Sequence, residues 1–149
     1  MFGDKIYLGS EVYYTFPSPE KLRGIKAGDM ENLKAGYRAG YIEDAVDKIT
    51  SGEINLDSIR DMDYLAAKNE LMKIKGVGPK VADCVLLFSM KKSCAFPIDV
   101  WVQRTMRQLY LKSDSTIKQI EKKAIELFGD YAGFAQQYLF YYARENGGF

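Results

Sequence analysis

The segment most suited to chemistry is residues 73–84, KIKGVGPKVADC, in which two glycines and a proline interrupt a lysine-rich run. Gly76, Val77 and Gly78 are too few for a flexible linker, and glycines permit a turn with positive φ that leaves backbone N–H groups uncovered. Pro79 suits the first position of a helix, whose N-terminal N–H groups attract anions. The segment predicts a phosphate-binding helical hairpin, although Gly-X-Gly alone more often marks an ordinary helix end followed by a helix start.

Two charged residues beside predicted helix starts could act on a bound substrate. Lys80 lies in the first turn of its helix, where the positive end of the helix dipole favours the free amine, the nucleophilic form. The alternative is a lysine that only flanks a phosphate site. Asp99 precedes another predicted helix and can cap it. Its carboxylate could also stabilise a developing positive charge, although an aspartate before a helix usually serves only as a cap.

The composition excludes several kinds of active site. The sequence contains no histidine, which removes Ser-His-Asp and Cys-His nucleophile systems, HExxH metal sites and histidine-containing zinc deaminase sites. Its two cysteines, Cys84 and Cys94, are too few for a disulfide framework or a four-thiolate iron–sulfur cluster. Lysine plus arginine (21) nearly equals aspartate plus glutamate (20), so affinity for a polyanion must come from local clusters.

The pattern of apolar residues predicts one all-α domain, a helical bundle, in the 149 residues. The only extended segment is expected at 6–16. No apolar stretch is long enough to span a bilayer and no secretory leader opens the chain, so a cytoplasmic protein is expected. Helices are expected after Ser18-Pro19, at 30–33 with Asp29 as cap, and at 37–49, 63–74, 79–90, 100–110, 115–128 and 130–145.

The helix expected at 79–90 is apolar nearly all round, which predicts a central, buried helix. Within it, Asp83 is expected to be an ordinary surface or capping acid, with the option that it tunes Lys80 one turn away.

Several segments together resemble one family. Gly76-Val-Gly-Pro-Lys-Val-Ala-Asp-Cys84 and Phe96-Pro-Ile-Asp-Val100, with Phe16-Pro-Ser18, Gly36-Tyr-Arg-Ala39 and Tyr131-Ala-Gly-Phe-Ala-Gln136, occur in the family's order over almost the whole chain. The chain resembles the helix-hairpin-helix (HhH-GPD) DNA glycosylase superfamily, and within it the 8-oxoguanine DNA glycosylase/AP lyase branch. The resemblance implies a partial HhH-GPD fold with its hairpin at about 71–90, and a role in base-excision repair on double-stranded DNA containing 8-oxoguanine or an abasic site.

The resemblance also implies roles for individual residues. Lys80 is the nucleophile that displaces the damaged base and forms a Schiff base with the deoxyribose, which leads to β-elimination, and Asp99 is its electrostatic partner. Because the target base must leave the duplex, Phe140 is expected to stack on it, Gln136 to bind its Watson–Crick edge and Cys84 to pack on its other side. As isolated sequence features, Phe140 would more often be a core residue and Gln136 part of a solvated face.

DNA contacts are implied for two further segments. Tyr37 and Arg38 would fill the gap in the duplex and read the orphaned cytosine, and the backbone would be gripped by the hairpin residues Lys75, Gly76, Val77 and Gly78. No catalytic metal or redox cofactor is implied, while a monovalent cation bridging hairpin carbonyls and a DNA phosphate is permitted. The expected protein is a monomer, associated with the nucleoid of a prokaryotic cell.

The sequence also departs from the family. Family members place a β-rich N-terminal domain and part of the damage-recognition apparatus before the matching region, so the chain is expected to be the C-terminal helical portion and to act on abasic sites before 8-oxoguanine. Trp101 stands where eukaryotic members have a phosphate-contacting histidine, and Ala143 replaces an aspartate. The alternatives are a non-catalytic helix-hairpin-helix DNA-binding fragment and a helical interaction domain. An endonuclease III-like enzyme is disfavoured by the missing cysteine set.

Overall fold

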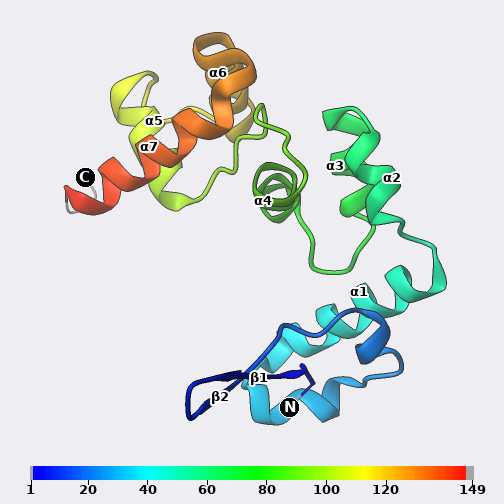
Figure 1. The fold of residues 1–149 in the computed structure, drawn as a ribbon. Helices are drawn as coiled ribbons and strands as arrows, with labels where there is room; N and C mark the ends of the chain where they lie inside the picture. The colour runs from blue at the N-terminus through cyan, green and yellow to red at the C-terminus, as the bar shows by residue number, and fades with distance from the viewer. Residues whose placement is uncertain (1, 147–149) are drawn as a thin grey trace. The chain divides into compact units, whose positions relative to one another are not determined.

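The computed structural model describes residues 2–146 and divides into two compact units (Figure 1). The first unit comprises residues 2–58 and 73–76, and the second comprises residues 59–72 and 77–146. The mostly helical architecture confirms the expected fold class, while the single domain expected from the sequence stays a prediction. Within residues 2–146, no helix is both long enough and apolar enough to cross a membrane.

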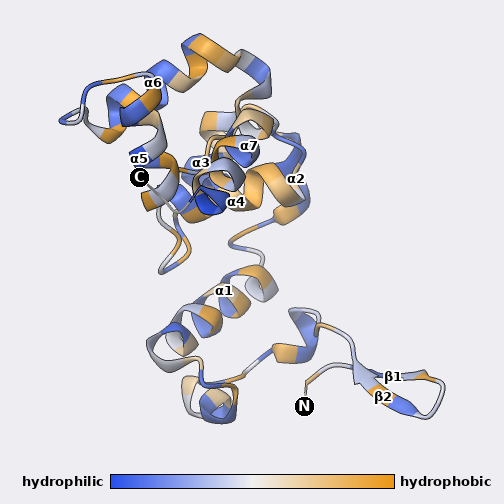
Figure 2. Cartoon of the chain, turned by 90° about the vertical axis from the view of Figure 1, so that its left-hand side faces the viewer, coloured by the Kyte–Doolittle hydropathy of each residue, from blue (hydrophilic) through white to orange (hydrophobic). Residues whose placement is uncertain are grey.

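The first unit begins with a two-stranded antiparallel hairpin, β1 (Lys5–Leu8) and β2 (Glu11–Tyr14), which starts one residue before the segment predicted to be extended at 6–16. Three short 3-10 helices follow, η1 (Glu20–Leu22), η2 (Ala27–Leu33) and η3 (Gly36–Arg38), and then α1 (Ala39–Ser51). Figure 2 shows both hydrophobic and hydrophilic residues along α1, as expected for an amphipathic helix. The core of this unit contains Leu22, Ile25, Met30, Ala39 and Val46.

Two local predictions in this unit were wrong. Asp29 does not cap a helix at 30–33, because the 3-10 helix begins earlier and the Asp29 carboxylate accepts a hydrogen bond from the Lys26 N–H at 2.8 Å. The sequence analysis also missed α2 (Leu56–Asp61), a six-residue helix that continues from the first unit into the second. Its start has a local signal, since Asn55 Oδ1 accepts from the Ser58 N–H at 2.9 Å.

The second unit contains five further α-helices in its described residues: α3 (Tyr64–Leu71), α4 (Pro79–Ser89), α5 (Val100–Leu109), α6 (Ile117–Phe128) and α7 (Ala132–Glu145), with η4 (Gly129–Tyr131) before α7. Asp99 caps α5 as predicted, accepting from the Val102 N–H at 2.8 Å, and Asp63, expected as the first residue of its helix, caps α3 by accepting from the Ala66 N–H at 3.0 Å. The start predicted for α6 at Ser115 was wrong by two residues. The hydroxyl of Thr116 caps this helix instead, in a capping box with Gln119.

The core of the second unit lies between α5, α6 and α7. It contains Phe96, Val102, Met106, Ile120, Ala124, Ala132 and Leu139. The prediction that α4 is a buried helix was wrong for one of its faces. Ala82, Asp83 and Leu86 are buried, but Val81 and Phe88 are 42% and 62% exposed. The helix is buried along one face only, so its apolar residues on the other face remain accessible.

Candidate active site

Three segments of the second unit enclose one cavity of about 170 Å³. Its lining residues come from α4, from the extended approach to α5 and from α7: Lys80, Cys84, Phe88, Pro97, Asp99, Gln136, Gln137 and Phe140. All five residues that the sequence analysis assigned to catalysis or to the base pocket are among them. The structure therefore brings together side chains that are separated by up to 60 positions in the chain.

Helix α4 supplies the cavity with a regular stripe. Lys80, Cys84 and Phe88 recur every four residues, so they lie along one face of the helix. Pro79 is the first residue of α4 and Gly78 caps it, which places Lys80 in the first turn as predicted. Lys80 is exposed, and its ammonium makes no ion pair within residues 2–146. An unpaired amino group at the edge of a cavity can reach a bound substrate.

Asp99 combines two functions in one side chain. Its Oδ1 accepts the hydrogen bond from the Val102 N–H at 2.8 Å and thereby caps α5. The same half-buried carboxylate lines the cavity and lies at the start of a helix. Because the capping bond fixes the side-chain rotamer, the negative charge is presented to the cavity without further ordering.

Helix α7 supplies an amide and an aromatic ring. Gln136 is only 4% exposed, so the alternative of a solvated side chain was wrong, and its Oε1 accepts from Gln137 Nε2 at 2.5 Å. Phe140 is partly buried against the core of the unit and also lines the cavity. The Arg144 guanidinium lies 5.7 Å from the centroid of the Phe140 ring. The Phe140 side chain thus packs against the core and also lines the cavity.

A glycine allows α7 to approach the chain that follows α4. The Gly133 N–H donates to the Ser93 carbonyl at 2.7 Å. A Cβ atom at Gly133 would lie 2.3 Å from Leu87 Cδ1 and 2.7 and 2.8 Å from the carbonyl oxygens of Ala95 and Ser93. Because two of these atoms belong to the backbone, no side-chain rotation relieves the contact. Only glycine at position 133 allows α7 to lie this close to the segment that follows α4.

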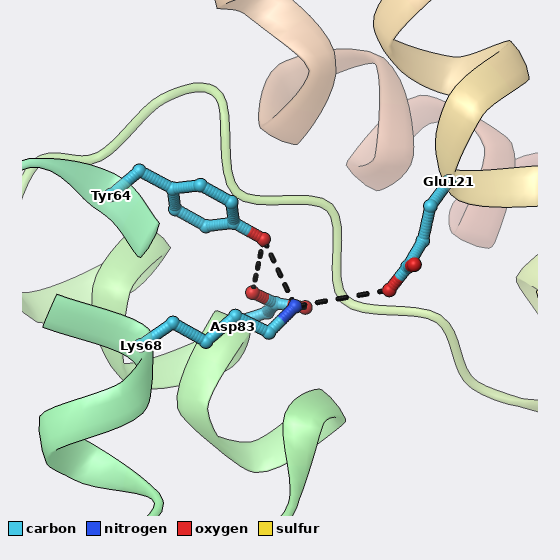
Figure 3. A network of polar contacts seen from close by, with 4 residues as sticks. All are labelled: Tyr64, Lys68, Asp83 and Glu121. Atoms are coloured by element: carbon cyan, nitrogen blue, oxygen red, sulfur yellow. Dashed lines mark hydrogen bonds and ion pairs between the residues drawn. The ribbon is translucent and has the colours of Figure 1, made fainter. Parts of the chain in front are cut away.

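A buried polar network fastens α4 to α3 one turn beyond Lys80 (Figure 3). Asp83 Oδ1 accepts from the Tyr64 hydroxyl and Oδ2 from Lys68 Nζ, both at 2.8 Å. Lys68 Nζ also donates to the Tyr64 oxygen at 3.0 Å and lies 3.8 Å from a carboxylate oxygen of Glu121 in α6. Asp83 is 3% exposed, so its expected surface position was wrong. A buried carboxylate requires such partners, and both of them lie on another helix, α3.

The pKa values in this network follow from its burial. Burial raises the pKa of Tyr64 to about 12, with a smaller opposing effect of the Lys68 bond and a reinforcing one from Asp83. Burial alone would lower the pKa of Lys68, but its hydrogen bonds to Asp83 and Tyr64 outweigh that effect and leave the pKa raised. The network therefore holds an ammonium and a neutral phenol around the Asp83 carboxylate at neutral pH.

The glycine turn is held by α1 within the first unit. Gly76 has φ of +81°, as predicted for the turn, and a Cβ atom there would lie 2.2 Å from the ring of Tyr41. The Lys75 N–H donates to Asp44 Oδ2 at 2.7 Å, a bond that lowers the pKa of Asp44, and Lys48 Nζ donates to the Lys73 carbonyl at 2.6 Å. One backbone donor expected to face a phosphate is thus already occupied.

The other predicted DNA-contact residues belong to both units. Gly78 has φ of −90°, so only Gly76 of the two glycines needs positive φ. Val77 and Gly78 begin the second unit. Tyr37 is 70% exposed, and the Arg38 guanidinium lies 5.0 Å from its ring centroid. Both belong to the first unit, so their assignment to the gap in a duplex stays a prediction.

Sequence reasoning missed three residues of the cavity: Phe88, Pro97 and Gln137. The spacing of Phe88, eight residues after Lys80 on the same helix, was a usable signal. Gln137 had no such signal, because its place depends on how α7 packs. Within residues 2–146 no group of three or more His, Cys, Asp or Glu could hold a metal ion.

Comparisons with known proteins find N-glycosylase/DNA lyases and other DNA glycosylases. A "Probable N-glycosylase/DNA lyase" of Methanothermobacter thermautotrophicus is 34% identical over 99% of this chain and 53% of its own length. The N-glycosylase/DNA lyase of Saccharomyces cerevisiae is 34% identical over 91% of this chain and 45% of its own length. No family model matches the sequence. With 53% and 45% of their lengths covered, the chain spans about half the length of the curated relatives it matches.

Solved structures show the same similarity. A Clostridium acetobutylicum 8-oxoguanine glycosylase/lyase in complex with dsDNA containing cytosine opposite to 8-oxoG superposes with a TM-score of 0.93 and 48% identity, covering 97% of this chain and 50% of that one. A 3-methyladenine DNA glycosylase from Archaeoglobus fulgidus superposes with a TM-score of 0.77 and 26% identity, covering 97% of this chain and 48% of that one.

Proposed function

Because the chain belongs to the 8-oxoguanine DNA glycosylase/AP lyase branch of the helix-hairpin-helix DNA glycosylase superfamily, we propose that it supplies the nucleophile and the base pocket of a bifunctional glycosylase/lyase. The observation that supports this proposal best is the single cavity in which Lys80 and Asp99 lie together with Cys84, Gln136 and Phe140. The substrate would be double-stranded DNA that contains 8-oxoguanine or an abasic site, and the working unit would be a monomer at the prokaryotic nucleoid.

In the proposed reaction, the free amine of Lys80 attacks C1′ of the target nucleotide. The new N–C1′ bond forms as the glycosidic bond breaks, and the base leaves with the bonding electron pair and takes up a proton. Loss of a proton from the nitrogen and opening of the C1′–O4′ bond give a Schiff base. Removal of a C2′ proton then expels the 3′ phosphate. On an abasic site, which has no base to lose, the Lys80 amine would add to the C1′ aldehyde and water would leave to give the same Schiff base.

Asp99 would stabilise the positive charge that develops at C1′ and O4′ while the glycosidic bond breaks. Its carboxylate suits this role because the capping bond to Val102 orients it in advance. Phe140 would stack on the extruded base, Gln136 would bond to its edge and Cys84 would pack on the other face. Half-buried and buried positions at the cavity wall are consistent with all three contacts.

The glycine turn would bind the DNA backbone. Since the Lys75 N–H already donates to Asp44, the donors proposed for a phosphate are the N–H groups from Gly76 to Gly78 and the start of α4. The carbonyl of Lys73 accepts a bond from the Lys48 ammonium. The monovalent cation that the resemblance permits would therefore use other carbonyls of the turn.

Borohydride trapping tests the proposal. The purified chain, Lys80→Gln and the matched control Lys118→Gln, an exposed lysine of α6, are incubated with borohydride and two duplexes, one with an abasic site and one with 8-oxoguanine opposite cytosine. We expect an adduct from the wild type and the control, stronger on the abasic duplex, and none from Lys80→Gln. No adduct from a folded chain that binds DNA would favour the non-catalytic DNA-binding alternative. Absence of salt-dependent DNA binding would favour a helical interaction domain.

A charge substitution at Asp99 separates its two roles. Asparagine caps helices about as well as aspartate, so Asp99→Asn should leave the free energy of unfolding within about 0.5 kcal/mol of the wild type. The rate of base excision should fall by about 10²-fold or more, because the carboxylate charge is lost from the cavity. An unchanged excision rate in a folded Asp99→Asn variant would limit Asp99 to capping.

A further inference from the structure

Two neighbouring glutamines of α7 meet at the wall of the candidate active-site cavity. Gln136 and Gln137 both line this cavity, and Gln137 Nε2 donates a hydrogen bond to Gln136 Oε1 at 2.5 Å. Consecutive residues of a helix point about 100° apart and do not face each other. The bond therefore requires both long side chains to bend toward the same place, which is the cavity.

Packing fixes the position of the Gln136 side chain but not the order of its amide atoms. The residue is buried, so the side chain cannot swing into solvent. A half-turn about its last torsion exchanges the oxygen with the NH2 group, which has nearly the same size, so packing barely distinguishes the two orders. Hydrogen bonds therefore decide which atom faces which way.

The bond from Gln137 selects one of the two orders. It occupies one lone pair of Gln136 Oε1, while Gln136 Nε2 donates to no protein group within residues 2–146. No buried side-chain nitrogen or oxygen in that range lacks a partner, so this NH2 group is not sealed in the core. The NH2 group can therefore donate to a molecule in the cavity, and the second lone pair of the oxygen can accept.

The order of the amide atoms determines which purines fit. A purine with a keto group at C6, such as 8-oxoguanine, offers an acceptor at O6 and a donor at N1–H. A purine with an amino group at C6, such as 8-oxoadenine, offers the reverse, a donor at N6 and an acceptor at N1. One glutamine amide can pair with either edge, but only with its oxygen and NH2 group in opposite orders.

We propose that Gln137 is a positioning residue that makes the cavity selective for 6-keto purines, by holding the oxygen of Gln136 toward the base N1–H and its NH2 group toward O6. The inference rests on the proposed function, because it requires that Gln136 bonds to the edge of the extruded base. When a base fills the cavity, water is excluded and the bond between the two amides becomes stronger. Gln137 thus acts through Gln136 and does not need to touch the base.

Three substitutions of Gln137 isolate its donor group. Gln137→Glu is ionised at neutral pH and can only accept, so it should draw the NH2 group of Gln136 toward itself and reverse the order. Gln137→Lys can only donate and should keep the order. Gln137→Met can do neither, which leaves both orders available. The control is Gln108→Glu, at an exposed position of α5, which adds the same charge outside the cavity.

Duplex affinity, measured by fluorescence anisotropy, tests the proposal. Every protein also carries Lys80→Gln, so that no base is excised, and the duplexes contain 8-oxohypoxanthine or 8-oxoadenine opposite cytosine. Both bases lack the 2-amino group of guanine, so the ratio of the two dissociation constants reports the edge at N1 and C6. A general effect of charge on DNA binding cancels in this ratio.

The expected changes follow from the energy of one amide–base pair. Such a pair discriminates against the wrong base by about 5- to 150-fold. With Gln137 unchanged, the preference for 8-oxohypoxanthine should be about fivefold or more, and Gln137→Lys and Gln108→Glu should keep it within about twofold. Gln137→Met should lose about fivefold or more of the preference, and Gln137→Glu about 25-fold or more, because the order is reversed rather than released.

Three results would overturn the inference. These are equal affinity for the two lesions with Gln137 unchanged, an unchanged preference in Gln137→Met, and equal changes of the preference in Gln137→Glu and Gln137→Lys. Thermal unfolding of each variant establishes that it is folded. The affinity ratio is measured without chemistry, whereas borohydride trapping of the wild type on an abasic duplex involves no base edge. Failure of this inference is therefore distinguishable from failure of the proposed function.

Discussion

The network around Asp83 makes a quantitative prediction about the second unit. Replacing Lys68 by methionine would leave the Asp83 carboxylate, with its side chain 4% exposed, bonded only to the Tyr64 hydroxyl. Replacing Asp83 by leucine would leave the Lys68 ammonium, 13% exposed, with Tyr64 and with Glu121 at 3.8 Å. Breaking one partner of a buried ion pair costs about 3–5 kcal/mol. We expect about 4 kcal/mol for Lys68→Met and about 3 kcal/mol for Asp83→Leu, because Glu121 partly compensates the stranded cation.

The double variant should lose far less unfolding free energy than the two single variants together. With both charges replaced by apolar side chains, no uncompensated ion remains, and such replacements are often neutral. The remaining loss is the hydrogen bond of the Tyr64 hydroxyl, about 1 kcal/mol. We therefore expect Lys68→Met/Asp83→Leu to lie within about 1 kcal/mol of the wild type, against about 7 kcal/mol if the single effects simply added.

Urea denaturation followed by tryptophan fluorescence is a suitable assay, because Trp101 is the single tryptophan of the chain and lies in α5 of the same unit as the network. A loss of 3 kcal/mol lowers the urea midpoint by about 1–3 M. Additive losses in the double variant would refute the reasoning, as would single variants that unfold like the wild type.

Three further predictions concern the pH dependence of the network and two glycines. Burial raises the pKa of Tyr64 to about 12, above its unfolded value of about 10. The contribution of Tyr64 to stability is therefore complete below pH 10 and is lost as the pH rises toward 12. Urea titrations at pH 9 and 11 should show this loss of stability, and the Tyr64→Phe variant should show a smaller dependence on pH. Gly133→Ala should lower the free energy of unfolding by about 2–3 kcal/mol in the same titration. The control Gly40→Ala, whose Cβ would meet nothing within 4 Å, should be neutral or slightly stabilising. Equal effects of the two substitutions would contradict the close approach of α7. Gly76→Ala should weaken duplex binding by about tenfold or more in fluorescence anisotropy, because the position has positive φ and the new methyl group would clash with the ring of Tyr41. Gly52→Ala is the control, because Gly52 has φ of +82° but open space around it. This control carries the backbone strain without the clash and should leave duplex binding unchanged.

The candidate site was predictable wherever its residues belong to local signals. The helix starts at Pro79 and after Asp99 depend on neighbouring residues, and so does the four-residue spacing that aligns Lys80 with Cys84. The resemblance to a family then linked these segments to Gln136 and Phe140. The structure places all of them at one cavity, while their chemical roles stay predictions.

Other features could not be predicted locally. Asp83 and Phe88 stand on the same helix among apolar neighbours, yet Asp83 is buried and Phe88 is exposed. The difference depends on α3, which brings Tyr64 and Lys68 to one side of α4. No window of sequence around residue 83 contains that information, because the partners of a buried charge come from other elements.

The sequence by itself determined the starts of α4 and α5, because Pro79 and the Asp99 cap act on the backbone within one turn. The absence of histidine limited the candidate catalytic side chains to Lys, Asp, Glu, Tyr and Cys, and the resemblance to a family selected Lys80 and Asp99 among them. Only the tertiary structure decided which face of each helix is covered. Packing excludes water from Asp83 and Gln136 and leaves Tyr138 of α7 exposed, and both outcomes depend on surfaces contributed by distant segments.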